Sequence, residues 1–383
     1  MDKELMQSSA LLIPAYKPDD RLPPYVAALK EAGVGKIVIV DDGSGESFRP
    51  LFDQIPQDDV TVVLSYTPNG GKGHALKTGM QYLMEHCPGQ KYIITADSDG
   101  QHTVTDVLRM VDALHENDEG LLLGSRDFSK NNKNVPWKSR FGNRTTSVVF
   151  KLFYGQWVTD TQTGLRGFER SLLPSMLAVR GERYEYEMNM LIDCAQQKTP
   201  MRALPIETVY ENNNEGSHFR PFQDSMRIYA VILGSFFKFI GTALLSWVVD
   251  YTLFVLLNLL FEKAFPWMNV TITLWFAAVI LRIAIAKVLA RLASGVVNYT
   301  LNKKLVFEDK GSAAKSGLRY VCIFILNLIL SVVLTSTLHL LLGVSENIIT
   351  IPVDIFLFIA NYFVQRAWVF KKPVPEAESQ TEA

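Results

Sequence analysis

Two aspartates and a glutamine follow the apolar run 92–96, in the order Asp97-x-Asp99-x-Gln101. Residues two apart in an extended segment face the same side, so we expect the two carboxylates to lie together. Paired carboxylates with a neighbouring amide oxygen suit a hard divalent cation, Mg²⁺ or Mn²⁺, that is shared with the phosphates of a substrate. An Asp-x-Asp sequence taken alone is more often a solvated turn or a helix cap. The neighbouring sequence therefore decides between the two interpretations.

A second acidic pair, Asp41-Asp42, closes another apolar run at 36–40 and favours the metal site. A glycine-rich loop at 69–73 adds Lys72, whose ammonium is placed to reach a diphosphate oxygen. An ordinary exposed turn lysine is the alternative, and both interpretations stay open. The loop has the spacing of neither a P-loop nor a dinucleotide-binding fingerprint. We therefore predict a site for a metal-bound diphosphate.

Short apolar, β-branched runs alternate with helix-like stretches in this half of the chain, which indicates an α/β domain with a largely parallel sheet. The predicted strands are 11–14, 36–40, 60–65, 92–96 and 121–124. The predicted helices between them are 23–31, 73–86 and 105–116. Ligands of such sheets bind beyond the carboxyl ends of the strands, which is where both acidic pairs fall.

Charge is distributed unevenly over the 383 residues, although the net charge is only −1. Residues 1–238 contain 56 charged side chains, whereas residues 239–372 contain 18. A near-neutral chain without a basic domain argues against nucleic acid as the main partner. The poorly charged second half excludes a purely soluble protein, because its apolar runs are long enough to cross a bilayer.

Four transmembrane helices are predicted in the second half, since a span needs about 20 predominantly apolar residues. They lie at about 239–261, 286–306, 320–343 and 348–368, with an interfacial or re-entrant piece near 270–284. Asp250 and Asp354 fall inside these runs and are expected to face the bundle interior or the membrane interface, because a lipid-facing charge is costly.

Basic residues gather between the second and third spans and after the fourth, as in Lys303-Lys304 and Lys371-Lys372. The positive-inside rule then predicts a multi-pass protein of the cell membrane whose N-terminal domain and C-terminus are cytoplasmic. Residues 373–383 are expected to form a disordered tail.

A ten-residue pattern recurs in the membrane half and indicates duplication of a two-helix hairpin. Asn298-Tyr299-x-x-Asn302-Lys303-x-x-Val306-Phe307 returns as Asn361-Tyr362-x-x-Gln365-Arg366-x-x-Val369-Phe370. The alternative is that interfacial aromatic and basic residues simply recur at membrane borders. The pattern resembles the GtrA-like membrane family, whose small four-helix proteins consist of two hairpins, over roughly residues 235–372.

Several motifs of the first half occur in the order seen in family 2 glycosyltransferases of GT-A fold. They are Ile13-Pro14-Ala15-Tyr16, Val40-Asp41-Asp42-Gly43-Ser44, Asn69-x-Gly71-Lys72-Gly73, Asp97-x-Asp99-Gly100-Gln101-His102, Gly124-Ser125-Arg126 and Thr163-Gly164-x-Arg166-Gly167-Phe168. They look most like the dolichyl-phosphate mannose synthase and polyprenyl-phosphate glucosyltransferase branch. The resemblance implies a Rossmann-like GT-A catalytic domain at 1–225, followed by an all-α transmembrane domain at 235–372.

The same resemblance assigns a donor site. It implies that Asp42 contacts the nucleoside, that Pro14 and Tyr16 frame the base, and that Arg166 takes part in substrate binding. Lys72 and Asp97 would meet the diphosphate, with Asp97, Asp99 and Gln101 on the metal. This chain departs from many members in having Lys17-Pro18, instead of an acidic residue, after the tyrosine.

The acceptor site is predicted at a basic amphipathic stretch, 136–154, of the type that lies in the membrane interface. A core-packing helix with a solvated face is the alternative, and 219–237 is a second interfacial candidate. Arg140 in the first stretch, with Arg126 as its partner, would meet a lipid phosphate, because guanidinium forks match phosphate oxygens.

These expectations describe a metal-dependent, inverting hexosyltransferase that acts from UDP-glucose or GDP-mannose on polyprenyl phosphate, for glycosylation of the cell envelope. Asp99, Arg126 and Arg140 are the predicted catalytic residues. Two alternatives remain: translocation of a lipid-linked sugar by the membrane half, as a flippase or its partner, and a processive polysaccharide synthase. The membrane and a second copy of the chain complete the expected partners.

Overall fold

The computed structural model describes residues 3–128, 135, 137–207, 221–274, 277–309, 311–344 and 346–370. The chain divides into two compact units, Met1–Ile232 and Leu233–Ala383, which are described separately. The predicted tail at 373–383 lies outside the described residues.

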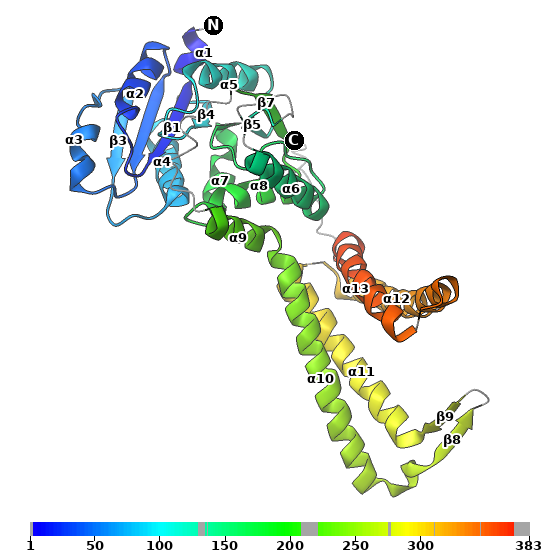
Figure 1. The fold of residues 1–383 in the computed structure, drawn as a ribbon. Coiled ribbons are helices and arrows are strands. Elements are labelled where there is room, and N and C mark those ends of the chain that lie inside the picture. The colour runs from blue at the N-terminus through cyan, green and yellow to red at the C-terminus, as the bar shows by residue number, and fades with distance from the viewer. Residues whose placement is uncertain are drawn as a thin grey trace, which may run out of the picture. The chain divides into compact units, whose positions relative to one another are not determined.

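A sheet flanked by helices forms the centre of the first unit (Figure 1). It has seven strands in the order β3-β2-β1-β4-β6-β5-β7. The strands are β1 (Ser9–Ala15), β2 (Lys36–Asp41), β3 (Thr61–Ser65), β4 (Tyr92–Thr95), β5 (Leu121–Ser125), β6 (Arg166–Glu169) and β7 (Met201–Pro205). Only β6 runs against its neighbours, β4 and β5, so the predicted α/β class with a mostly parallel sheet is confirmed. The chain reverses its direction of travel across the sheet between β1 and β4, where ligands bind in such folds.

Helices connect the strands and cover the sheet, as their amphipathic sequences require. They are α1 (Lys3–Gln7), α2 (Leu22–Glu31), α3 (Arg49–Phe52), α4 (Lys72–His86), α5 (Val104–Glu116), α6 (Trp137–Tyr154), α7 (Leu173–Ala178), α8 (Glu185–Gln197) and α9 (Pro221–Ile232), with 3₁₀ turns η1 (Glu46–Phe48) and η2 (Arg170–Leu172). The core consists of fully buried aliphatic residues of β1, β2 and β4 packed on α2 and α5. This packing fixes the strand ends on which the site is built.

Four long helices form the second unit, close to the predicted segments. They are α10 (Gly234–Ala264), α11 (Leu281–Leu301), α12 (Ala313–Leu342) and α13 (Glu346–Val364), preceded or followed by the short elements η4 (Pro266–Asn269), η5 (Asn302–Val306) and η6 (Gln365–Val369). The piece predicted near 270–284 contains a β-hairpin, β8 (Thr271–Leu274) with β9 (Ala277–Ile280), and α11 begins directly after it. Its interfacial or re-entrant placement stays a prediction. Among the described residues, two helical stretches are long and apolar enough to cross a membrane, 234–264 and 313–331.

The two halves of the second unit carry the same local feature at the same place of the repeat. Each second helix, α11 and α13, ends in one turn of π-helix, at Asn302–Val306 and at Gln365–Val369. Isolated π-helical turns are rare. Their occurrence at matching positions supports duplication over chance recurrence of border residues.

Polar side chains line the inside of α10, whereas its outside is apolar. Thr242, Ser246 and Asp250 are buried at spacings of four, toward α11, while Leu244 and Trp247 are more than half exposed. Inside, Asp250 lies 3.2 Å from Lys287 Nζ. This inverted pattern is that of a helix whose exposed face meets lipid.

Candidate active site

Lys72 stands at the carboxyl edge of the sheet between two carboxylates. Its Nζ lies 2.7 Å from Asp97 Oδ1 and 2.9 Å from Glu187 Oε1. The other oxygen of Asp97 faces His102, with Oδ2 3.4 Å from Nε2. Asp97 follows β4, His102 lies just before α5 and Glu187 lies on α8. The loop, the strand end and the helix thus meet at one ionic cluster.

Burial and charge act in opposite directions on this cluster. Burial disfavours the ammonium of Lys72, but Asp97 and Glu187 outweigh it and raise the pKa of Lys72 above its usual value. Burial likewise opposes ionisation of Asp97, yet Lys72 and His102 hold the pKa of Asp97 well below its usual range. For Asp99, burial and the charge of Asp97 raise the pKa. The pKa values of Asp97 and Asp99 are therefore shifted in opposite directions, which is typical of sites that bind or transfer charged groups.

Two glycines place Lys72 at the first position of α4. A Cβ on Gly71 would lie 2.6 Å from the carbonyl oxygen of Glu182, and one on Gly73 would lie 2.5 Å from Cβ of Tyr186. Real Cβ atoms do not approach so closely, so only glycine lets the start of α4 pack against the start of α8. This contact explains the glycine spacing of the 69–73 loop, and it excludes the exposed-turn interpretation of Lys72.

The donor chemistry around Asp97 and Asp99 fits a divalent cation. Both are oxygen donors beyond a strand end, and Asp99 accepts a hydrogen bond from the backbone N–H of Gln101 at 3.1 Å. Gly164 makes room for the Asp97 carboxylate, since a Cβ there would lie 2.3 Å from Oδ2. In the described part of the chain, no three His, Cys, Asp or Glu side chains form a closed metal cage. A two-carboxylate site is typical of Mg²⁺ held jointly with waters and substrate phosphates.

Asp42 is buried and holds the glycine-rich loop. Its carboxylate accepts hydrogen bonds from the Tyr66 hydroxyl at 2.7 Å, from Asn69 Nδ2 at 2.9 Å and from the N–H groups of Gly70 and Gly71 at 2.7 and 2.9 Å. These bonds tie the end of β2 to the loop that leads into α4. Asp42 thus acts on Lys72 through the loop, and its contact with a nucleoside stays a prediction.

The end of β1 lies next to this loop system. Pro14 is buried within β1, and Tyr16 is half-buried just beyond the strand. Lys17 adopts a left-handed backbone, with φ 49°, and donates its N–H to Ser44 Oγ at 2.8 Å. Its Nζ lies 5.3 Å from the centroid of the Tyr16 ring. Lys17 thus places a positive charge beside the Tyr16 ring.

Arg126, after β5, forms a two-point ion pair that the sequence analysis did not identify. Its Nε and Nη2 donate to the two oxygens of Asp160 at 2.7 and 3.1 Å, and the Asp160 side chain is fully buried. In the sequence, Asp160 could have been noticed as an acidic residue three positions before the motif that begins at Thr163. A buried carboxylate thereby holds the Arg126 guanidinium in place.

Helix α6 is fastened to the same loop by Asn143. Its Nδ2 donates to the carbonyl of Thr159 at 2.6 Å, and its Oδ1 accepts from the N–H of Thr161 at 3.1 Å. These two threonines flank Asp160, the partner of Arg126. Arg140 precedes Asn143 by three residues and so lies on the same side of α6. The Arg140 Nη2 group donates to the carbonyl of Val135 at 3.4 Å, just before the helix, and the partnership of Arg140 with Arg126 stays a prediction.

The two faces of α6 are the reverse of those of a core-packing helix. The buried face is largely polar, with Asn143, Thr146 and Ser147 at most 3% exposed. The exposed face is apolar, with Trp137 and Phe141 at 69% and 67%. Val148 and Leu152 continue this face. An apolar stripe turned outward is the pattern of an interfacial helix, so the solvated-face alternative does not describe α6.

Helix α9, within the second predicted interfacial stretch, packs against α6. Tyr229 and Thr146 join their hydroxyls at 3.3 Å, and the Tyr154 hydroxyl donates to the carbonyl of Ile232 at 3.0 Å. Ile228 and Ile232 are buried. Helix α9, the last helix of the first unit, is thus joined to α6 by hydrogen bonds.

Arg166, the first residue of β6, is almost completely buried. Its Nε donates to the carbonyl of Thr163 at 3.0 Å and its Nη1 to the carbonyl of Glu187 at 2.7 Å. No hydrogen-bond partner for Nη2 occurs among the described residues. Because the Glu187 side chain binds Lys72, the hydrogen bond from Arg166 to the Glu187 carbonyl helps to position the ionic cluster. Direct contact of Arg166 with the substrate stays a prediction.

Family comparisons agree with both units. Residues 10–177 match the model of glycosyl transferase family 2, and residues 238–370 match that of the GtrA/DPMS transmembrane domain. An uncharacterised protein of Methanocaldococcus jannaschii is 31% identical over 202 residues, which are 52% of this chain and 81% of that protein.

Two characterised relatives are similar over the first unit. The UDP-N-acetylglucosamine–dolichyl-phosphate N-acetylglucosaminyltransferase of Methanococcus voltae is 29% identical over 52% of this chain and 85% of its own length. The polyprenol monophosphomannose synthase of Mycolicibacterium smegmatis is 25% identical over 48% and 71%. A solved structure, glucosyl-3-phosphoglycerate synthase from Mycobacterium tuberculosis, aligns with a TM-score of 0.45 at 16% identity, over 60% of this chain and 80% of that one.

The site geometry, the order of the sheet and both domain matches converge on one assignment. The chain belongs to glycosyl transferase family 2 and joins its catalytic domain to a GtrA/DPMS transmembrane domain.

Proposed function

We propose that the protein transfers a hexose from a nucleoside-diphosphate sugar to polyprenyl phosphate at the membrane surface. The proposal rests on helix α6, whose apolar face is exposed, with Trp137 and Phe141 turned outward. Its buried face binds the 159–161 loop, which contains the ion-pair partner of Arg126. A water-soluble acceptor would not require an exposed apolar helix beside the site. Two relatives are named for transfer to dolichyl phosphate or for polyprenol monophosphomannose synthesis, which agrees with a lipid acceptor.

The donor is proposed to bind at the ionic cluster, between the ends of β1, β2 and β4. Lys72 would move from the carboxylates to a diphosphate oxygen, while Asp97 and Asp99, with Gln101, would hold Mg²⁺ or Mn²⁺ there. The cation would supply Lewis-acid stabilisation of the departing nucleoside diphosphate. Pro14 and Tyr16 would frame the base, and Asp42 would keep the glycine-rich loop in position.

The acceptor phosphate is proposed to meet Arg140 and Arg126. A phosphate monoester is mostly a dianion near neutral pH, so it attacks without a general base. A phosphate oxygen forms the new bond to the anomeric carbon, and the bond from that carbon to the diphosphate breaks. The nucleoside diphosphate leaves with the bonding electron pair, so no proton has to move. Attack from the opposite side of the ring inverts the anomeric centre, which gives a β-linked polyprenyl-phospho-sugar from an α-linked donor.

One assay tests this proposal. The purified full chain is incubated in detergent with polyprenyl phosphate, Mg²⁺ and, separately, UDP-glucose, GDP-mannose or UDP-N-acetylglucosamine, and the lipid fraction is analysed by mass spectrometry. We expect one hexose unit per lipid from one preferred donor. A growing series of sugar masses would instead indicate a processive synthase, and no lipid-linked sugar from any donor would contradict the proposal.

A further inference from the structure

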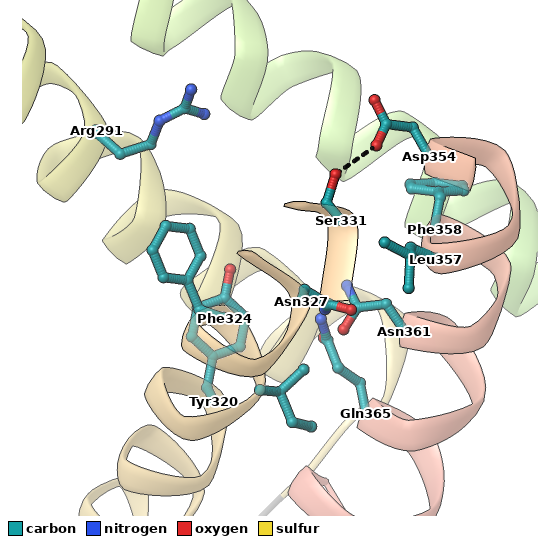
Figure 2. Close-up of a pocket in the computed structure, with 11 residues that line it drawn as sticks. Arg291, Tyr320, Phe324, Asn327, Ser331, Asp354, Leu357, Phe358, Asn361 and Gln365 are labelled. Carbon is teal, nitrogen blue, oxygen red and sulfur yellow. Dashed lines mark hydrogen bonds between the residues drawn. The ribbon is translucent and has the colours of Figure 1, made fainter. Parts of the chain in front are cut away.

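Charged side chains that the proposed reaction does not use occur in both units. In the second unit, Arg291 and Asp354 lie on opposite sides of a largely apolar cavity of about 520 Å³ (Figure 2). Each has a partner inside that unit: Arg291 Nη1 lies 3.8 Å from Asp250 Oδ2, and Asp354 accepts a hydrogen bond from Ser331 at 3.1 Å. In the first unit, Glu187 instead binds a residue of the proposed donor site. Glu187 can therefore affect that site directly.

One ammonium is shared by two carboxylates at the donor site, and only one of these carboxylates belongs to the proposed metal site. Lys72 Nζ lies 2.7 Å from Asp97 Oδ1 and 2.9 Å from Glu187 Oε1. The Glu187 side chain is only 13% exposed, so salt and water screen this pair much less than an ion pair on the surface. Glu187 therefore competes with Asp97 for the charge of Lys72.

Packing fixes Glu187 in this position. Its main-chain carbonyl accepts a hydrogen bond from Nη1 of the buried Arg166 at 2.7 Å. The preceding residue, Tyr186, is fully buried and packs against Gly73, which follows Lys72 on α4. Groups that are carried by packed helices are held more precisely than groups on loops. The start of α8 thus holds the Glu187 carboxylate at a defined place beside the Lys72 ammonium.

A cation and an ammonium repel each other when both approach one carboxylate, because their charges are alike. Without Glu187, the Lys72 ammonium would pair with Asp97 alone and would compete with a cation there. We propose that Glu187 is a positioning residue, which draws Lys72 away from Asp97 and so leaves that carboxylate available to a divalent cation. The inference rests on the proposed function, because it takes Asp97 and Asp99 as the ligands of the cation.

Binding of Mn²⁺ to the purified full chain in detergent tests this role in the absence of donor and acceptor. Electron paramagnetic resonance measures the free Mn²⁺ that remains at each total concentration, and binding that persists in Asp99→Asn is subtracted. We expect Glu187→Gln to raise the Kd for Mn²⁺ about tenfold, as loss of a group that orients a metal ligand commonly does. Melting temperatures verify that each variant is folded. An unchanged Kd would overturn the proposal.

Substitution of Lys72 shows whether Glu187 acts through the ammonium. Lys72→Met should by itself lower the Kd for Mn²⁺, because the competing charge is gone, and a raised Kd would overturn the proposal even where Glu187→Gln does not fold. In the Lys72→Met background, Glu187→Gln should change the Kd by less than about twofold, since a double-mutant cycle isolates the coupling of the two residues. An effect as large as in the wild-type background would show direct attraction between Glu187 and the cation, and the proposal would be wrong.

Glu185→Gln is the matched control on the same helix. It removes one negative charge two residues before Glu187, from a carboxylate that accepts hydrogen bonds from the N–H groups of Glu182 and Arg183. This variant should keep the wild-type Kd for Mn²⁺. Equal losses in Glu185→Gln and Glu187→Gln would show a general effect of negative charge and would overturn the proposal.

Mn²⁺ binding is measured without turnover, so the two proposals can fail separately. No lipid-linked sugar from any donor, together with the expected changes in Kd, would contradict the proposed function alone. Formation of lipid-linked sugar, with the same Kd in the wild type and in Glu187→Gln, would contradict the role of Glu187 alone. If the wild type binds no more Mn²⁺ than Asp99→Asn, the metal assignment and the role of Glu187 are both wrong.

Discussion

A single ammonium, that of Lys72, compensates two carboxylates in the catalytic unit, and a donor bound as proposed would have to replace these ion pairs. Lys72 contacts Asp97 and Glu187 at hydrogen-bond distance. At the proposed donor site Asp97 would hold the cation of a metal-bound diphosphate, and the ammonium of Lys72 would pair with a phosphate oxygen. Exchange of one ion pair for another keeps the buried charges compensated throughout.

Neutralising either aspartate of the motif should therefore stop transfer without unfolding the protein. Asp97→Asn and Asp99→Asn are each expected to lower the transfer rate by roughly a hundredfold or more, as loss of one electrostatic group at a reacting centre does. Initial rates of lipid-linked sugar formation, with melting temperatures to verify folding, check this. EDTA should inactivate the wild type, and excess Mg²⁺ or Mn²⁺ should restore it. Asp118→Asn, which removes an exposed partner of Lys91, is the control, and full activity of either site variant would rule out the metal assignment.

A second prediction at the residue scale concerns Arg140 and the binding of the acceptor phosphate. Arg140→Ala should raise the KM for polyprenyl phosphate about tenfold or more, since a charge-assisted hydrogen bond is worth about 1.5–3 kcal/mol, and should leave the KM for the donor nearly unchanged. Arg140→Lys should recover part of the loss, because an ammonium cannot form the two-point contact. Arg144→Ala changes an exposed arginine of the same helix and should behave as wild type. A raised donor KM with unchanged acceptor kinetics would instead place Arg140 at the diphosphate.

At the scale of elements, the contact between α4 and α8 positions the ionic cluster, and glycine makes the contact possible. In Gly73→Ala the new methyl would lie 2.5 Å from Cβ of Tyr186, so α4 must move and Lys72 with it. We expect a loss of about 1–3 kcal/mol in the free energy of unfolding, the usual cost of overpacking, together with reduced transfer. Thermal unfolding and the transfer assay measure both. Gly89→Ala, where a Cβ meets nothing within 4 Å, should be nearly neutral, and an equal loss there would contradict the packing argument.

The same contact explains which parts of the site could be predicted from the sequence. Strand ends and their acidic pairs follow from local alternation, so the edge with Asp97 was predictable. The ion pair of Lys72 with Glu187 joins residues 115 positions apart and depends on how α4 meets α8. The pairing of Arg126 with Asp160 depends similarly on a buried loop with no periodic pattern. Local patterns predict elements, whereas contacts between elements require the packed structure.

The amphipathic pattern of α6 is compatible with an interfacial helix and with a core-packing helix, because the pattern does not say which face is buried. The structure buries the polar face through Asn143 and leaves the apolar face outside. Conversely, the interfacial piece predicted near 270–284 is a β-hairpin and the start of α11. The residues there are apolar or β-branched, and short apolar runs do not distinguish strand from helix.

For the whole molecule, the proposed reaction requires that donor and catalytic unit share the cytoplasmic side of the membrane. Nucleoside-diphosphate sugars are highly charged and do not cross a bilayer unaided, because ions are expensive to transfer into hydrocarbon. The basic residues after α11, among them Lys303, Lys304 and Lys315, agree with this orientation, because the positive-inside rule predicts that they lie in the cytoplasm. In contrast, Lys263, in the last turn of α10, is the only lysine or arginine of the sequence from 239 to 281.

Cysteine labelling on intact cells tests this orientation. Of the native thiols, Cys87 and Cys194 are buried and Cys322 is exposed, so the test uses a Cys322→Ala background. Ser312→Cys, between α11 and α12, should react with a membrane-impermeant maleimide only after the cells are permeabilised, since the positive-inside rule places that loop in the cytoplasm. Asn269→Cys, between α10 and α11, should react on intact cells, because one helix separates it from the catalytic unit. Labelling of Ser312→Cys from outside would place the basic loop on the far side of the membrane, and the catalytic unit could then not share a compartment with its donor.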